Sequence, residues 1–238
     1  MQTKIFSLVY PMCLLILVTG CNKKESAEIT GAVTFVVGKA ELHTPAVKKT
    51  VKVGDSFSQG DMIKTGKDGV VVATIGQDDA IIEIQNDSEF KVAEYSDKNK
   101  NLDLQKGNLW LKVKKLNKGA NFSLKSATSV AAVRGTKFFT FQLGDIFGTC
   151  VCEGQVEMDL KNPVKNKEKE QNRDYLIISR GNKTVILKPE DLKFMGTVGK
   201  DHQHSMLDNS PVGKKAQFTP EAMKKFAEFL NSKLDQVK

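Results

Sequence analysis

The chain has 238 residues, 40% hydrophobic and 27% charged, which is the composition of an ordinary globular protein with one large or two small domains. Its 36 Lys and Arg against 28 Asp and Glu give a formal net charge of +8, so the folded part favours anionic surroundings. Nucleic acid is set aside as the partner because the N-terminus predicts export from the cytosol.

Residues 1–20 predict a lipoprotein signal peptide. A lysine precedes the apolar run 5–18, and Val18-Thr19-Gly20-Cys21 then matches the bacterial lipobox. A membrane-spanning helix needs about 20 apolar residues, whereas this run has fourteen, so an uncleaved anchor helix is the less favoured alternative. The lipobox implies that Cys21 receives the lipid and begins a polar tether over residues 21–28.

The residue after the lipidated cysteine bears on location. Several acyl chains would hold the protein permanently on a membrane, whereas one chain binds only marginally. Asn22 stands where an Asp retains lipoproteins at the inner membrane of well-studied diderm bacteria. By that analogy we expect the outer membrane rather than the inner one, and the choice between its periplasmic and surface faces stays open.

Residues 29–190 predict an all-β domain of short strands separated by glycine-containing turns. Gly54-Asp55 and Gly60-Asp61 each combine a residue suited to positive φ with a side chain that can bond its own turn. Gly76-Gln77-Asp78-Asp79 predicts a hairpin between its flanking apolar runs. Turns recur about every ten residues without a helical pattern between them, which indicates a β-sandwich, barrel or roll, with solenoid-like coils as an alternative.

Two later strands have distinct patterns. In residues 109–113 the apolar side chains alternate, and Trp110 shares the other face with lysines, so we expect that face to lie in water. Residues 131–141 are rich in β-branched and aromatic residues. Phe138 points to one side of this strand while Phe139 and Phe141 point to the other, which predicts a central strand covered on both faces.

The remaining elements complete the domain organisation. The charged run 161–173 predicts an exposed loop, and residues 175–178 and 184–187 predict a hairpin. Residues 191–218 read as a connector. Residues 219–238 predict a C-terminal amphipathic helix, capped by Thr219, whose apolar face we expect to dock on this protein's own sheet rather than in a partner's groove.

No catalytic constellation is evident in the sequence, so we expect a protein that is not an enzyme and has no cofactor. Cys150 and Cys152 share one face of a strand and could form a zinc site with His202 and His204. We favour buried thiols and solvated imidazoles, and therefore no metal, because the two pairs are distant in the sequence. A disulfide between the cysteines is disfavoured by strand geometry, and their role stays open.

The segment Val133-Arg134-Gly135-Thr136-x-Phe138 resembles the signature of the FecR-like domain family, whose periplasmic all-β module follows an export segment. We expect the motif to be structural, with Arg134 enclosed by nearby carbonyls or a carboxylate rather than displayed to an anionic ligand. The resemblance spans roughly Gly31 to Leu187 and includes further family-like segments: Gly54-Asp55, Gly60 to Gly66, Gly107 to Trp110, and Gly148 to Val156.

The resemblance also implies a class of function. In the namesake regulators a cytoplasmic anti-sigma domain precedes a transmembrane helix, and the periplasmic module receives a signal from a TonB-dependent transporter. Here we expect the anti-sigma domain to be missing and the module to bind another envelope protein, as a sensor or scaffold. Two alternatives are a lipoprotein that binds cell-wall or surface polysaccharide and, less favoured, a metal-dependent hydrolase.

Overall fold

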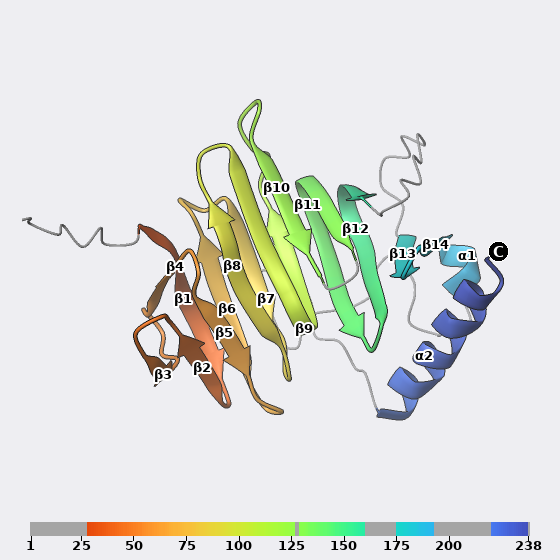
Figure 1. Ribbon diagram of the computed structural model, residues 1–238, viewed down its shortest axis with the longest axis horizontal. Coiled ribbons are helices and arrows are strands. Elements are labelled where there is room, and N and C mark those ends of the chain that lie inside the picture. The colour runs from red at the N-terminus through yellow and green to blue at the C-terminus, as the bar shows by residue number, and fades with distance from the viewer. Residues whose placement is uncertain (1–27, 127–128, 160–174, 193–219, 238) are drawn as a thin grey trace, which may run out of the picture.

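The computed structural model describes residues 28–126, 129–159, 175–192 and 220–237. Within these ranges fourteen strands form one continuous sheet (Figure 1). The strands pair antiparallel except for β9 and β10, which run parallel. The chain is therefore all-β with a helix at the C-terminal end, as the sequence predicts.

The pairing pattern divides the sheet into two layers. The first layer contains β3 (Lys48–Thr50), β2 (Ala40–His43), β5 (Met62–Thr65), β8 (Glu89–Tyr95) and β10 (Asn121–Lys125). The second layer contains β4 (Ser56–Ser58), β1 (Ile29–Val37), β6 (Val70–Ile75), β7 (Ala80–Ile84), β13 (Tyr175–Arg180) and β14 (Lys183–Leu187). Three long strands belong to both layers: β9 (Asn99–Val113), β11 (Val130–Leu143) and β12 (Ile146–Asp159).

Each long strand passes from one layer to the other at a glycine. In β9, residues 100–106 pair with β8, whereas residues 109–113 pair with β7. Gly107 lies at this change of partner with φ +87°, and Gly154 lies within β12 with φ +89°. Side-chain-bearing residues rarely adopt such φ values, so glycine allows the strands to bend without strain. The sheet thus folds over on itself into a sandwich, which is one of the architectures expected from the sequence.

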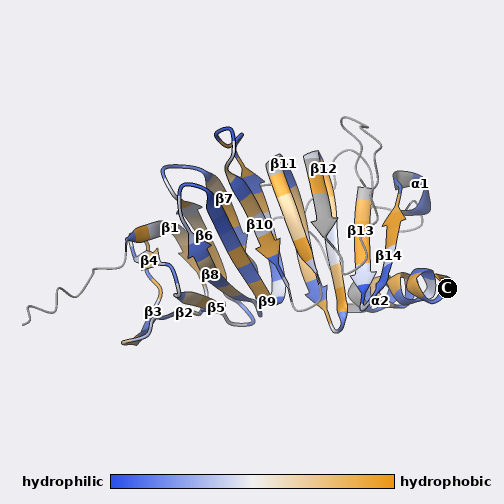
Figure 2. Cartoon of the chain, turned by 45° about the horizontal axis from the view of Figure 1, so that its top comes forward, coloured by the Kyte–Doolittle hydropathy of each residue, from blue (hydrophilic) through white to orange (hydrophobic). Residues whose placement is uncertain are grey.

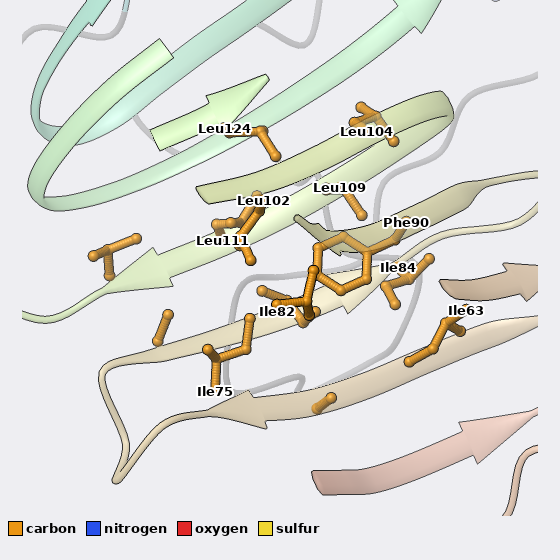
Figure 3. Close-up of a cluster of buried hydrophobic side chains, with 14 of the residues drawn as sticks. Ile63, Ile75, Ile82, Ile84, Phe90, Leu102, Leu104, Leu109, Leu111 and Leu124 are labelled. Carbon is orange, nitrogen blue, oxygen red and sulfur yellow. The ribbon is translucent and has the colours of Figure 1, made fainter. Parts of the chain in front are cut away.

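The main core lies between the two layers (Figure 3). Ile63, Phe90 and Leu102 project from the first layer, and Ile82 and Leu109 project from the second, and all are 0% or 1% exposed. This is the alternation that a sheet with one buried face requires, because successive side chains of a strand point to opposite sides. Burial of each such side chain stabilises the fold by about 1.5–3 kcal/mol.

A second cluster covers the outer face of the second layer. Helix α2 (Pro220–Asp235) buries Phe226, Leu230 and Leu234 there, and strands β11 to β14 carry the apolar stretches beneath it (Figure 2). The ring centroids of Phe141 and Phe226 are 5.5 Å apart. Arg180 donates hydrogen bonds to Asn231 and Asp235 of the helix. The prediction that the helix docks on its own sheet is confirmed.

The turns follow the expected chemistry. The hairpins β6–β7 and β13–β14 form as predicted. Gly54 and Gly60 have positive φ, and Asp55 and Asp61 accept backbone N–H bonds from Lys52 and Ser58, each at 2.8 Å. The carboxylates thus close their own turns, as the Gly-Asp pairs indicate.

Two features differ from the expectations. Trp110 is only 2% exposed, so the prediction that its face of β9 lies in water was wrong at this residue, because the second cluster covers it. A short helix, α1 (Pro189–Leu192), follows β14 and crosses the expected boundary between the β-domain and the connector, and the Asp191 carboxylate accepts the Lys188 N–H at its beginning. The predicted loop 161–173 and most of the connector lie outside the described residues.

Candidate functional site

The motif that the sequence singles out lies where β11 passes between the layers. Val133 is 5% exposed and Phe138 is 0% exposed, and both belong to the main core. Gly135 between them has φ +61°. Thr136 is 2% exposed. Four of the five motif residues therefore lie in the interior or at the bend. The motif therefore builds the corner at which the sheet folds over.

The neighbouring strand fits closely against this corner. A Cβ at Gly154 of β12 would lie 2.6 Å from the Gly135 carbonyl oxygen and 3.0 Å from Thr136 Cα. Gly154 thus meets two needs at once, a positive φ and room for the backbone of β11. Arg134 pairs with Gln155 through the backbone. Its side chain lies outside what the structure describes, so its two proposed roles stay as predictions.

Phe138, Phe139 and Phe141 divide between the two clusters as predicted. Phe138 lies in the main core, and the other two lie under helix α2. Trp110, opposite Phe139 on β9, has the Lys137 ammonium 5.3 Å from its ring centroid. A central strand buried on both faces explains the dense aromatic content of this segment.

The two cysteines of β12 also lie under this cover. Cys150 is buried within the second cluster, and Cys152 packs against its margin. No disulfide joins Cys150 and Cys152. His202 and His204 lie outside the described residues, and the described part of the chain contains no group of three or more His, Cys, Asp or Glu side chains suited to a metal ion.

The outer face of the first layer carries a row of polar side chains across three strands. Asn99 and Asn101 of β9 donate hydrogen bonds to the Glu94 carboxylate of β8 at 3.2 and 2.6 Å. Ser123 of β10 donates to Asn101 Oδ1 at 2.6 Å. All four residues are partly exposed. This polar row, defined by these four residues, offers amide, carboxylate and hydroxyl groups to a polar ligand.

A polar network around the buried Lys100 ties the layers together at the β6–β7 and β8–β9 turns. Lys100 is 6% exposed and donates to the carbonyl oxygens of Ser96 and Asp97, while its Nζ lies 3.6 Å from Asp79 Oδ2. Tyr95 donates its hydroxyl proton to the same carboxylate oxygen at 2.5 Å. Burial raises the pKa of Tyr95, and the hydrogen bond to Asp79 raises it further. The network fixes the geometry of this end of the sandwich.

The described strands leave edges that another strand could join. β14 pairs only with β13 within the described residues, and residues 155–159 of β12 pair only with β11. An edge of this kind presents unpaired backbone N–H and C=O groups. Addition of a strand to such an edge is a common way for one protein to bind another.

Comparison with known proteins places this geometry in a class. The family model described as FecR protein matches residues 61–157, which run from the turn before β5 to the second half of β12. This matched part contains all three bent strands and the motif at the corner. It is shorter than the span over which the sequence resembles the family, which also includes β1 to β4, β13 and β14. Residues 61–157 are thus similar in sequence to the FecR family.

The similarity to solved structures is weak. Two crystal structures of a candidate anti-sigma factor from Parabacteroides distasonis are similar to the chain, at 14% and 13% identity, each with a TM-score of 0.45. They cover 72% of this chain, and the alignments cover 92% and 91% of those chains. No curated protein matches the chain.

The predicted lipidation site, Cys21, lies outside the described residues. In the part of the chain that the structure describes, no helix is both long and apolar enough to cross a membrane.

Proposed function

We propose that this chain is a lipid-anchored bacterial envelope protein whose FecR-like β-domain binds another protein, as a sensor or scaffold. The observation that carries the proposal is the family match over residues 61–157, which coincides with the bent strands at the centre of the fold. FecR-like modules are regulatory, so binding rather than catalysis is the activity that this match supports.

Anchoring follows from the lipobox that ends at Cys21. The acyl chains hold the body at the membrane surface, on the outer membrane rather than the inner one by the identity of Asn22. Growth with radiolabelled palmitate tests this step directly. Label on the wild-type protein and its absence from Cys21→Ser are expected, whereas an unlabelled wild-type protein in the soluble fraction would overturn the anchor.

The free edge of β14 is the part of the fold best suited to a protein partner. The strand has five residues and lies at the end of the sheet opposite β4. A partner strand paired with it would gain backbone hydrogen bonds without disturbing the core. The main-chain contacts would supply affinity, and the side chains of alternate residues would supply specificity.

Cross-linking in intact cells tests the proposed binding. A photoreactive residue placed at Val185 in β14 should capture one specific envelope protein, whereas the same residue at Lys118, in an exposed turn far along the chain, should not. Capture of the same background proteins at both positions would count against β14 as the binding edge.

A second candidate function rests on the polar row. Amide, carboxylate and hydroxyl groups lined up across a sheet face suit the hydroxyl groups of a wall or surface polysaccharide. Sedimentation of the protein with purified peptidoglycan, at low and high salt, separates the two functions. Binding that is lost in Asn101→Ala and survives high salt would favour the polysaccharide, because a contact driven only by the net positive charge weakens with screening.

A further inference from the structure

The exposed apolar side chains gather at one edge of the sandwich. We call this the N-terminal edge: β1, β3, the β2–β3 turn and the segment 51–55 that joins β3 to β4. Single exposed apolar residues are normal on any protein surface, but within the described residues the large ones all lie here. They are Ile29 at 66%, Phe35 at 46%, Val37 at 45%, Val47 at 52% and Val53 at 61% exposure.

Hydrogen bonds hold segment 51–55 across this edge. Val51 N–H donates to the Ala40 carbonyl of the first layer at 2.9 Å. Gly54 N–H then donates to the Val33 carbonyl of β1, in the second layer, at 2.8 Å. The Asp55 carboxylate closes the turn by accepting the Lys52 N–H. Val53 thus projects from a fixed turn that runs beside β1.

The same edge carries an excess of positive charge. Between residues 35 and 55 there are four lysines, one glutamate and one aspartate, and all four lysines are exposed: Lys39, Lys48, Lys49 and Lys52. Lys49 pairs with Asp55 at 2.7 Å. The other three have no acidic side chain within ion-pair distance among the described residues. Exposed apolar side chains therefore lie next to lysine side chains along the N-terminal edge.

The N-terminal edge also lies at the start of the folded body. Cys21 precedes Glu28, the first described residue, by seven positions, and a chain of that length reaches at most about 25 Å. β3 and β4 end the sheet here, whereas β14 and α2 lie at the opposite end of the molecule (Figure 1). Any anchor at Cys21 keeps the N-terminal edge close to the lipid.

We propose that the N-terminal edge docks on the surface of an anionic membrane. Phe35, Val37 and Val53 enter the boundary between headgroups and acyl chains, and the lysines contact anionic headgroups. A lipid surface fits better than a protein partner, because lysine is depleted from protein interfaces but attracted to acidic lipids. The inference rests on the proposed lipid anchor and adds an orientation: the body lies against the membrane with α2 pointing away from it.

The test uses the full mature lipoprotein reconstituted into vesicles of phosphatidylcholine with and without phosphatidylglycerol. An environment-sensitive fluorophore is attached at Val53→Cys and, as the control, at Glu228→Cys on the exposed side of α2, both in a Cys150→Ala/Cys152→Ala background. With phosphatidylglycerol present, the label at position 53 should shift to the blue and be quenched by nitroxide lipids. The label at position 228 should do neither.

Charge reversal tests the role of the lysines. Lys48→Glu and Lys52→Glu should each lower the ratio of docked to undocked protein by about fivefold or more, since each lysine near an anionic surface adds attraction of that size. Lys118→Glu, which reverses a charge in another exposed turn, should leave the ratio unchanged. A measurement without any variant is amide hydrogen exchange of the wild-type lipoprotein, which should slow at residues 52–54 in anionic vesicles relative to detergent.

The outcomes separate the inference from the anchor. A protein without acyl mass on Cys21, not retained by vesicles of either composition, would overturn both. A retained protein whose labels at positions 53 and 228 behave alike, and whose exchange at residues 52–54 is unchanged, would overturn the docking and leave the anchor standing. Protection that appears in detergent and grows with protein concentration would also overturn it, because a second copy would then cover the edge.

Discussion

The bend in β9 can be tested by one substitution, Gly107→Ala. At this position φ is +87°, and an added Cβ would lie 2.2 Å from Ser88 Oγ and 2.6 Å from Ser88 Cα. A left-handed backbone costs a residue other than glycine about 1–2 kcal/mol. Because one close atom belongs to the backbone, the neighbouring chain must also move, at a further cost of about 1–3 kcal/mol. We therefore expect a loss of about 2–5 kcal/mol in the free energy of unfolding.

A matched glycine separates the two contributions. Gly119 has φ +90°, and an added Cβ there would meet no atom within 4 Å. Gly119→Ala should therefore cost only the backbone strain, about 1–2 kcal/mol. Urea unfolding followed through the fluorescence of Trp110, the chain's single tryptophan, measures both variants in one assay. Equal losses for Gly107→Ala and Gly119→Ala would refute the close approach of Ser88 to the bend.

Three further predictions follow from contacts in the same structure. Lys100→Met should destabilise the fold by about 1–3 kcal/mol because it removes the hydrogen bonds that the buried, charged Lys100 ammonium donates, whereas Lys114→Met, in an exposed pair, should cost at most about 1 kcal/mol in the same urea assay. The pKa of Tyr95 is higher in the folded state than its ordinary value of 10.0, so its contribution to the free energy of unfolding is complete below about pH 10 and is lost as the pH rises further. A Tyr95→Phe protein should lack this part of the stability loss at alkaline pH. Identical stability profiles of the two proteins at alkaline pH would contradict the network. Leu230→Ala should loosen α2 at a cost of about 2–5 kcal/mol and speed thiol labelling of Cys150, and an unchanged labelling rate would argue against the helix as its cover.

Local chemistry predicted the strands and turns well. Alternating apolar residues and Gly-Asp pairs act over a few positions, so the turns closed by Asp55 and Asp61 could be predicted from the sequence alone. The same holds for Phe138 and Phe139, because opposite orientation of neighbours is intrinsic to a strand. The start of the C-terminal helix and its apolar face could also be predicted from the sequence.

Long-range features could not be predicted in the same way. The pattern of β9 predicts that Trp110 points away from Leu109, but not what lies on that side. The residues that cover Trp110 lie much later in the sequence, from Phe139 in β11 to Leu234 in α2. Likewise, a glycine inside a strand pattern signals a bulge, a bend or a close contact without distinguishing them. Only the pairing partners of β9 on either side of Gly107 identify it as a passage between layers.

The three shared strands make the sandwich indivisible. No single cut in the chain separates one layer from the other, since β9, β11 and β12 each contribute hydrogen bonds to both. Fragments produced by proteolysis or by split-protein engineering would each contain an incomplete part of both layers. We therefore expect the sandwich to respond to force as one rigid unit. A force applied to β14 at one end would be transmitted through the three shared strands to β1 and β4 at the other end.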